Sequence, residues 1–314
     1  MINKVAPRDV LGDILAELGT VNEKIVVLDA DYYTASKTAA FRKKFPDRFI
    51  QVGIAEQNMM GVAAGLATLG LIPYVSTLAT FCSRRACDQV TTSIAISGLN
   101  VKILAVYTGL FVGKNGASHQ ALEDLAIMRS IARMAVLQPV NAVETAQIVR
   151  FAAEYEGPMY IRIARDPSTV ELPEDYRFQL GKALTLKEGK DLTIISCGEV
   201  VEDVIAAAAI LEKQGIYPRL INMSSIKPLD EEAIIKAAVE TGRIVTVENH
   251  NILAGLGSAV AEVVSEHYPV KVKRLGIRDR FGRSGTNDEM KAWFGLRAED
   301  IADDIVTFLG DYHV

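Results

Sequence analysis

Short apolar segments alternate with helical patterns along this chain, and this alternation limits its possible folds more than any other feature. We expect strands at residues 25–29, 74–77, 101–107, 135–138 and 159–163. Helical patterns separate most of these segments, and such an alternation favours a mostly parallel sheet. With 314 residues, of which 49% are hydrophobic, the chain is long enough for two ordinary domains, each with its own core.

A polar, proline-containing segment from Pro167 to Tyr176 divides this alternation. After it we expect a helix at 200–213 and strands at 192–196, 218–222 and 244–248. The predicted fold class is therefore α/β, with two domains that each hold a mostly parallel sheet flanked by helices. We place the first domain at residues 1–178 and the second at residues 179–314.

A lone carboxylate follows the apolar segment from Phe49 to Ile54, which reads as a short strand. Glu56 then begins a helix through Ala67, whose small and apolar residues suit a fully buried helix. Burial raises the pKa of a carboxyl group, so a glutamate here can share a proton with the ring nitrogen of a ligand. The alternative is a carboxylate that only complements the dipole at a helix N-terminus.

Charge and cysteine content exclude several classes of function. The net charge of -5 and the scattered Lys and Arg residues leave no basic stripe, so we predict no nucleic acid or membrane-surface partner. The cysteines and the four histidines show no paired spacing for zinc. The odd, sparse cysteine count and a start without an apolar signal core favour the cytoplasm. Residues 59–82 carry no charge, but Gly70 and Pro73 divide them into a helix and a strand, so we predict no membrane span.

Four segments resemble motifs of the transketolases, and the likeness continues to the C-terminus. They are 46–50 (PDRFI), 53–58 (GIAEQN), 76–81 (STLATF) and 113–126 (GKNGASHQALEDLA), of which the last is the most specific. In the second half, residues 226–230 and 247–250, followed by the glycine-containing run 254–258, resemble the transketolase C-terminal domain. The resemblance gives these residues an architectural role, which includes His250.

The resemblance implies thiamine diphosphate as the cofactor. Glu56 is then the carboxyl group beside the aminopyrimidine ring, where it drives the change to the imino tautomer. Phe81 resembles the aromatic residue that stacks on this ring, with an ordinary core phenylalanine as the alternative. Leu78 stands where many transketolases have a second Phe, which predicts a pocket of altered shape. Asp31 resembles an acidic residue near the cofactor at the end of the first strand, and it is equally suited to cap a helix.

The substrate residues implied by the resemblance are Asn115, His119 and Arg165. His119 resembles a histidine that reaches the sugar phosphate, and we expect it to be catalytic together with Glu56. Arg165 resembles the arginine that grips the same phosphate through its planar fork. The alternatives are a helix cap or surface group for His119 and a surface ion pair for Arg165.

Two departures from the family pattern bear on the substrate. Asn115 replaces an Asp that contacts a substrate hydroxyl in many transketolases, and Asn carries no charge. The segment 107–112 is shorter than in the family, and Gly109 is nearest to the position of a histidine that has no counterpart here. These departures leave room for a ketose other than the common pentose phosphates.

The chain contains no Gly-Asp-Gly motif, which transketolases use with a following Asn to hold the diphosphate and its divalent cation. The resemblance therefore implies the C-terminal subunit of a split transketolase. Its N-terminal partner subunit is expected to supply the diphosphate loop and the ligands of Mg²⁺ or Ca²⁺, within an α2β2 assembly. The implied reaction moves a two-carbon ketol unit from a ketose phosphate to an aldose phosphate.

Three alternatives stay open at this point. Within the thiamine enzymes they are a deoxyxylulose-phosphate-synthase-like activity and the β subunit of a 2-oxo acid dehydrogenase, and outside them a non-catalytic scaffold subunit. Gln57, Asn58 and the segment 119–124 favour a transketolase over the dehydrogenase. The presence of Glu56 and Phe81, together with the histidine in that segment, argues against a scaffold.

Overall fold

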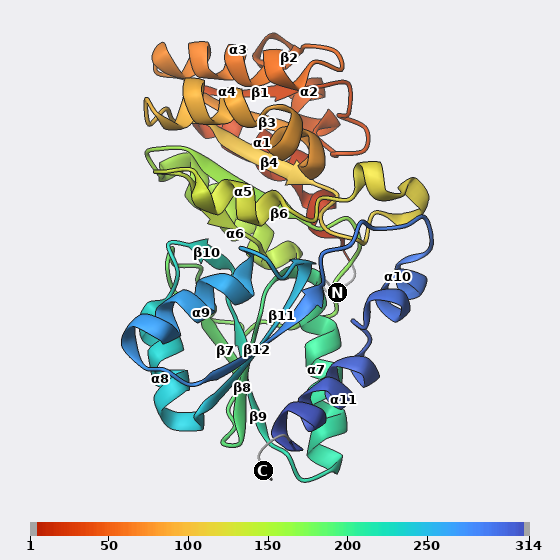
Figure 1. Ribbon diagram of the computed structural model, residues 1–314. Coiled ribbons are helices and arrows are strands. Elements are labelled where there is room, and N and C mark those ends of the chain that lie inside the picture. Colours follow the sequence, from red (N-terminus) through yellow and green to blue (C-terminus); the bar gives the residue numbers. More distant parts are fainter. Residues whose placement is uncertain (1–4, 311–314) are drawn as a thin grey trace.

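The computed structural model describes residues 5–310, which form two stacked α/β units (Figure 1). The first unit holds a seven-stranded sheet in the order β10-β5-β6-β4-β3-β1-β2. Its parallel strands are β1 (Ile25–Asp29), β2 (Phe49–Gln51), β3 (Ile72–Leu78), β4 (Lys102–Val106), β5 (Ala135–Leu137) and β6 (Met159–Ile163). The predicted mostly parallel sheet is therefore confirmed, although β2 is shorter than the strand expected at residues 49–54.

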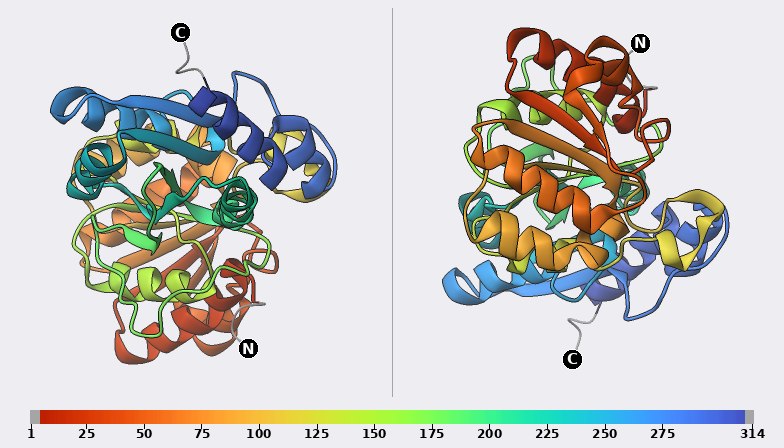
Figure 2. Two further views of the ribbon diagram at one scale, coloured as in Figure 1. Left: turned by 90° about the horizontal axis from the view of Figure 1, so that it is seen from below. Right: turned by 90° about the horizontal axis from the view of Figure 1, so that it is seen from above.

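Helices cover both faces of this sheet (Figure 2). One face carries α3 (Glu56–Thr68), α5 (Asp124–Ser130) and the helical segment 81–95, in which two π-helical stretches flank the short α4 (Cys87–Gln89). The other face carries α1 (Leu11–Val21), α2 (Ala39–Lys44) and α6 (Ala142–Glu154). Among residues 5–310, no helix combines the length and the apolar content needed to cross a membrane.

The second unit has a five-stranded sheet in the order β12-β11-β8-β9-β7. Its strands are β7 (Leu184–Lys187), β8 (Leu192–Ser196), β9 (Pro218–Asn222), β11 (Arg243–Asn251) and β12 (Lys271–Ile277), and β7 alone among them runs antiparallel to its neighbour. Helices α7 (Val201–Lys213) and α11 (Ala298–Gly310) pack on one face, with α10 (Asn287–Phe294) beside them. Helices α8 (Glu231–Thr241) and α9 (Leu256–His267) pack on the other.

One strand of the C-terminal half belongs to the sheet of the first unit. β10 (Ser225–Lys227) lies beyond the boundary predicted at residue 178, yet it pairs antiparallel with β5 at the sheet edge. It satisfies backbone N–H and C=O groups that an edge strand otherwise leaves unpaired. The two halves are therefore joined by a strand pairing that the order of elements along the chain does not predict.

Helix α3 begins at Glu56 as predicted, but the expectation that it is fully buried is wrong for this chain alone. Its apolar face packs against the sheet through Met59, Met60, Ala63 and Ala64. The opposite face is exposed at Gln57, Asn58, Gly61, Gly65 and Thr68. Small residues suit either a buried helix or a flat exposed one, so composition did not distinguish the two.

A fully buried arginine connects the two units. Arg162 on β6 donates from Nε to Asp124 Oδ2 at 2.8 Å and from Nη1 to Gln138 Oε1 at 3.1 Å. Its Nη2 donates to the backbone oxygens of Ala121 and Asn249, the latter on β11 of the second unit. A buried charge requires such complete pairing, so this network restricts how the two units can be oriented.

His250 on β11 has the architectural role that the resemblance implies. It is fully buried, its Nδ1 donates to Asn251 O at 2.6 Å, and its Nε2 accepts from Ala126 N at 3.4 Å. Burial lowers the pKa of His250 to about 4, which keeps the ring neutral near pH 7. The neighbouring Glu248 accepts from Leu256 N and Gly257 N at the start of α9.

Replacing Glu248 with Gln is expected to change the pH dependence of folding. Burial raises the pKa of Glu248 from its ordinary 4.5 to about 7. Between these values the native chain holds a proton that the unfolded chain has lost, so this group makes the free energy of unfolding fall by about 1.4 kcal/mol per pH unit as the pH rises. Above about pH 7, the pKa of Glu248 in the folded chain, its contribution to the free energy of unfolding has been lost.

The Glu248→Gln variant lacks this contribution. We therefore compare the free energies of unfolding as variant minus natural chain. This difference should increase with pH, by about 1.4 kcal/mol per pH unit, between about pH 5 and pH 7. Urea titrations across this range measure the difference directly. A difference that does not vary with pH would contradict the burial of a protonated Glu248.

Candidate functional site

Three of the residues predicted to bind the cofactor lie at neighbouring ends of secondary structure. Asp31 follows β1 by two residues, Leu78 is the last residue of β3, and Glu56 is the first residue of α3. Strands β1 and β3 are parallel neighbours, so their carboxyl ends meet at one edge of the sheet. Parallel α/β sheets bind ligands at this edge.

Glu56 is almost completely buried, with 2% of its surface exposed. Its Oε2 accepts a hydrogen bond of 2.8 Å from Nη1 of Arg85, whose side chain is 45% exposed. The chain therefore provides one partner for the carboxylate that the sequence leaves alone at the start of a helix. That partner comes from the π-helical segment after β3 and is not close in sequence.

Phe81 lies between this ion pair and His119. The Cζ atom of Arg85 is 4.2 Å from the centroid of the Phe81 ring, and the His119 ring meets the same ring edge-on at 5.5 Å between centroids. His119 Nδ1 is 2.9 Å from Ser118 Oγ. These residues surround a hollow of about 570 Å³, which is lined by Thr80, Phe81, Arg84, Arg85, Ser118 and His119.

Leu78 and Asp31 take different positions relative to this hollow. Leu78 is 5% exposed and packs in the core with Tyr107 and Val112, so it does not line the hollow. Asp31 is exposed, has a φ of 59°, and donates its backbone N–H to Gln51 Oε1 at 2.7 Å. The alternative that Asp31 caps a helix is wrong, because the next α-helix begins at residue 39.

The structure places Arg165 in a cluster that sequence reasoning did not identify. Arg165 Cζ lies 5.2 Å from the centroid of the Tyr107 ring, and Arg8 Cζ lies 5.0 Å from the same centroid. Arg8 also donates to the Tyr107 hydroxyl, and the Tyr32 ring meets Tyr107 edge-on at 5.6 Å. Within residues 5–310, the buried Nε atoms of both arginines have no hydrogen-bond partner.

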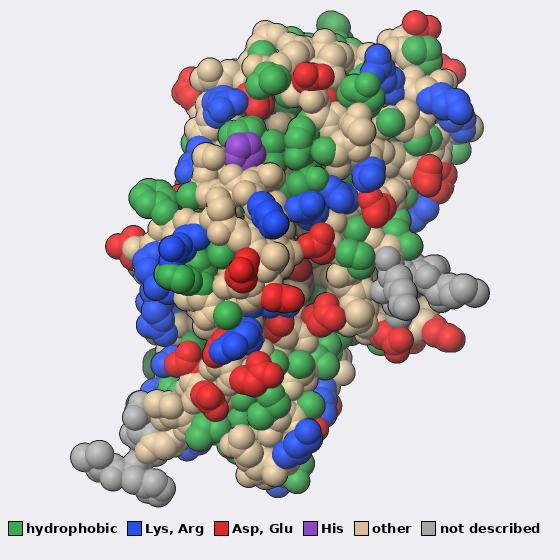
Figure 3. All heavy atoms as spheres, turned by 90° about the vertical axis from the view of Figure 1, so that its right-hand side faces the viewer, with side chains coloured by type: hydrophobic (Ala, Val, Ile, Leu, Met, Phe, Trp, Pro, Cys, Tyr) green, Lys and Arg blue, Asp and Glu red, His purple; other side chains and the backbone are tan. Residues whose placement is uncertain are grey.

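This cluster favours an anionic ligand. The carboxylates nearest to the two guanidinium groups are those of Asp9, at 3.8 Å from Arg8 Nε, and Asp166, at 4.0 Å from Arg165 Nε. Both distances are too long for a hydrogen bond, so within residues 5–310 neither guanidinium group has a carboxylate bonded to it, which favours phosphate-like oxygens as ligands. On the face seen in Figure 3, Lys and Arg side chains lie across the middle, with Asp and Glu side chains directly beside them. No sequence signal around Arg8 separates it from an ordinary surface arginine.

The loop that carries Asn115 also contains Gly109, and the structure explains why a glycine stands there. Asn115 is exposed near the tip of the loop between β4 and α5. Gly109 in the same loop has a φ of 58°, and a Cβ atom there would lie 2.3 Å from the side chain of Asn249. No side chain fits at this position, so the histidine usual in transketolases cannot be present at Gly109.

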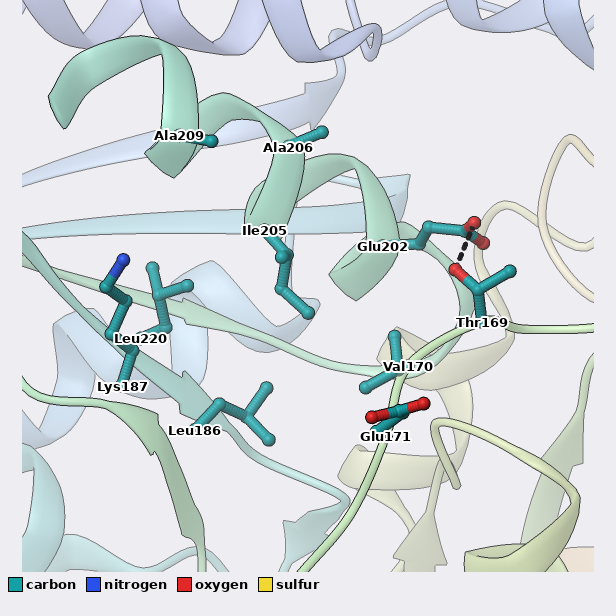
Figure 4. A pocket seen from close by; sticks show the side chains of 10 residues that line it. All are labelled: Thr169, Val170, Glu171, Leu186, Lys187, Glu202, Ile205, Ala206, Ala209 and Leu220. Carbon is teal, nitrogen blue, oxygen red and sulfur yellow. Dashed lines mark hydrogen bonds between the residues drawn. The ribbon is translucent and has the colours of Figure 1, made fainter. Parts of the chain in front are cut away.

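A second pocket of about 620 Å³ lies in the C-terminal half, away from these residues. Helix α7 and the strands β7 and β9 form its mostly apolar walls, and Thr169 donates to Glu202 at its rim (Figure 4). None of the predicted site residues lines it. Within residues 5–310, no cluster of three or more His, Cys, Asp or Glu residues could hold a metal ion.

The fold defines a class of protein, the two-domain α/β proteins with a mostly parallel sheet in each domain. Such sheets bind ligands at their carboxyl edge, where the predicted cofactor residues lie. The transketolase pyrimidine binding domain matches residues 3–168, and the transketolase C-terminal domain matches residues 181–301. The chain therefore belongs to the transketolase family. This family depends on thiamine diphosphate.

The most similar relatives include subunits of two-chain transketolases. The chain is 44% identical to the 6-deoxy-6-sulfo-D-fructose transketolase subunit SqwH of Clostridium sp. strain MSTE9, over 94% of this chain and 91% of that protein. It is 46% identical to a putative transketolase C-terminal section of Methanocaldococcus jannaschii, over 93% of this chain and 92% of that protein. It is 40% identical to one subunit of the apulose-4-phosphate transketolase of Phocaeicola vulgatus, over 98% of both chains.

A solved structure supports the same assignment. A split-gene transketolase, described as an inactive β4 tetramer, superimposes with a TM-score of 0.90 and 47% identity over 96% of this chain and 98% of that one. The chain thus corresponds to the C-terminal subunit of a split transketolase, an enzyme that works with a partner subunit. The transketolase of Campylobacter jejuni shares the fold at a TM-score of 0.83, and this chain spans 47% of it.

Proposed function

We propose that this chain, with an N-terminal transketolase subunit, transfers a two-carbon ketol unit from a ketose phosphate to an aldose phosphate. The observation that carries the proposal is the position of Arg85. Its planar guanidinium bonds to Glu56 and lies over the Phe81 ring at the same time. One flat nitrogen-containing group can therefore reach both residues, as the aminopyrimidine ring must.

The chain's own residues then have distinct roles at this ring-binding site beside Glu56 and Phe81. Glu56 holds a proton against the ring nitrogen, and its burial excludes water from that hydrogen bond. Phe81 fixes the ring plane by apolar contact. When bound, thiamine diphosphate supplies the nucleophilic carbon that carries the ketol unit. Asp31 lies near the same sheet edge, and Leu78 shapes the core below it.

The sugar is proposed to lie between the hollow and the arginine cluster. Arg165 and Arg8 would present two guanidinium groups, neither bonded to a carboxylate among the described residues, to its anionic end, and His119 lines the hollow beside Phe81. Asn115 is expected to contact a sugar hydroxyl. Relatives are named for 6-deoxy-6-sulfo-D-fructose and for apulose 4-phosphate, so we propose a sugar with a terminal phosphate or similar anion as the substrate.

The partner subunit is proposed to cover the exposed face of α3 and to complete an α2β2 assembly. Gly61 and Gly65 leave this face flat on the helix that begins at Glu56, and beyond the helix's own nearby residues nothing in the described part of the chain lies within 4 Å of a Cβ added to either. We further propose that the partner holds the diphosphate through Mg²⁺ or Ca²⁺. The three free cysteines suit a reducing compartment, which supports a cytoplasmic location.

The test is reconstitution. The chain and its N-terminal partner are purified separately, mixed with thiamine diphosphate and Mg²⁺, and assayed for ketol transfer between phosphorylated sugars. Each chain alone is expected to be inactive, and the mixture active with the mass of an α2β2 complex. Turnover by this chain without any partner would remove the proposal.

Replacing Arg85 with Ala is expected to strengthen thiamine diphosphate binding to the complex. The guanidinium occupies the contacts proposed for the ring, so it must leave Glu56 before the ring can bind. The pair is partly exposed, which limits the gain to about two- to fivefold in Kd. Calorimetric titration measures it, with Arg133→Ala as a matched surface control. Weaker binding in Arg85→Ala would show that Arg85 holds the cofactor instead of competing with it.

A further inference from the structure

The C-terminal half lies against the loop that carries Asn115 and His119. In Figures 1 and 2, the segment before α10 runs beside the loop between β4 and α5. Gln120 of this loop is 1% exposed and donates from Nε2 to Leu110 O at 3.1 Å and to Arg283 O at 3.0 Å. The same side chain therefore ties the loop to itself and to the C-terminal half.

The two segments approach each other closely at a glycine. A Cβ atom at Gly282 would lie 1.7 Å from Gln120 Oε1. Any larger residue at position 282 has to displace the Gln120 amide, which makes both hydrogen bonds, or the segment itself. The contact is thus part of how the two halves fit together.

A single amide side chain extends this contact to the arginine cluster. Asn287, the first residue of α10, accepts from Gly113 N at 3.3 Å through Oδ1. Its Nδ2 donates to Asp166 Oδ2. Asp166 Oδ1 in turn lies 4.0 Å from Nε of Arg165. Asn287 therefore joins Gly113, two residues before Asn115, to the residue beside Arg165.

Helix α10 holds Asn287 in a fixed place. Thr286 caps the helix and accepts from Glu289 N, while Glu289 Oε2 accepts from Thr286 N at 2.7 Å, which forms a capping box. Met290 and Phe294 bury the other face of the helix in the core of the second unit. The amide at position 287 is therefore supported from both the helix end and the core.

We propose that Asn287 is a positioning residue for sugar binding, through which the C-terminal domain sets the spacing between the Asn115–His119 loop and Arg165. This inference rests on the proposed function. A substrate held at both ends needs those ends at a fixed separation, and displacements of about 1 Å in such a site have large kinetic effects. The C-terminal domain thus contributes to substrate affinity without contacting the substrate.

The first test is Asn287→Ala in the reconstituted complex. We expect KM for the phosphorylated acceptor to rise about tenfold, because two hydrogen bonds that hold the loop and Arg165 at their spacing are lost. The fall in kcat should be smaller than the rise in KM, because Glu56 lies on α3, outside this contact. With an unphosphorylated short aldehyde as acceptor, KM should change much less. Asp288→Ala, on the exposed neighbour, is the matched control and should behave as the natural chain.

The second test exchanges donor and acceptor. Asn287→Asp alone places a carboxylate against Asp166 and should raise KM further than Asn287→Ala. Adding Asp166→Asn restores an amide donor opposite a carboxylate acceptor, and the new acceptor can still bind Gly113 N. Recovery of KM in the double variant supports the proposal, since a loss caused only by general destabilisation has no reason to recover.

The outcomes separate the inference from the function on which it rests. An Asn287→Ala complex with unchanged KM, or a double variant without recovery, overturns the positioning role, provided that Arg165→Ala raises KM in the same assay. A complex that transfers no ketol unit at all overturns the proposed function instead. Thermal unfolding of each variant, compared with the natural chain, tests whether the fold is retained.

Discussion

Glu56→Gln is expected to lower kcat of the reconstituted complex by about 10²- to 10⁴-fold. The amide has the shape of the carboxyl group but cannot hold or move its proton. The side chain is 2% exposed and bonds to Arg85, which lies over the Phe81 ring, so bulk water has little access to take over its role. Steady-state assays at saturating sugar measure the change.

The control for this variant is Glu17→Gln, which removes a carboxylate from an exposed ion pair with Arg150. It should leave kcat unchanged. The KM values for the sugars should shift little in Glu56→Gln, since the arginine cluster is intact. If Glu56→Gln keeps near-normal turnover, Glu56 has no catalytic role, and the proposal that the aminopyrimidine ring binds beside Glu56 and Phe81 is wrong.

Arg165→Ala is expected to raise KM for phosphorylated sugars by about ten- to hundredfold. The variant loses a planar fork of donors whose Nε atom has no partner within the described residues. Arg165→Lys should recover only part of the loss, because an ammonium group keeps the charge but neither the fork nor the contact with the Tyr107 ring. Initial rates against sugar concentration give both values.

The same assay with an unphosphorylated acceptor provides the specificity control for Arg165. Its KM should be nearly the same in Arg165→Ala and in the natural chain. Arg177 is an exposed arginine outside the cluster, so Arg177→Ala should leave KM unchanged for both acceptors. If Arg165→Ala raises KM equally for phosphorylated and unphosphorylated acceptors, the role of Arg165 is structural instead.

Much of the fold was predictable from local pattern. Strands at residues 25–29, 159–163, 192–196 and 218–222 agree to the residue with β1, β6, β8 and β9. Buried parallel strands need continuous apolar runs between turn residues, and such runs are visible without any knowledge of their partners. The start of α3 at Glu56 is visible because a run of small and apolar residues follows the glutamate.

The contacts within the site were less predictable. Glu56 and Phe81 were identified through motifs, but the arginine that bonds to one and stacks on the other was not. Arg8 was missed because its partner, Tyr107, is 99 residues away in sequence. Pairings of this kind depend on loop closure and on the sheet order, which leave no periodic signal in the chain.

By itself, the sequence determined the alternation of strands and helices, the family, and the identity of the chemical groups, since all of these depend on residues that are near one another in the chain. Only the tertiary structure decided that β10 completes the first sheet, that Arg8 and Arg165 share one tyrosine ring, and that α10 contacts the loop between β4 and α5. These are long-range contacts. Their free energy comes from burial and pairing that exist only once the two halves have packed together.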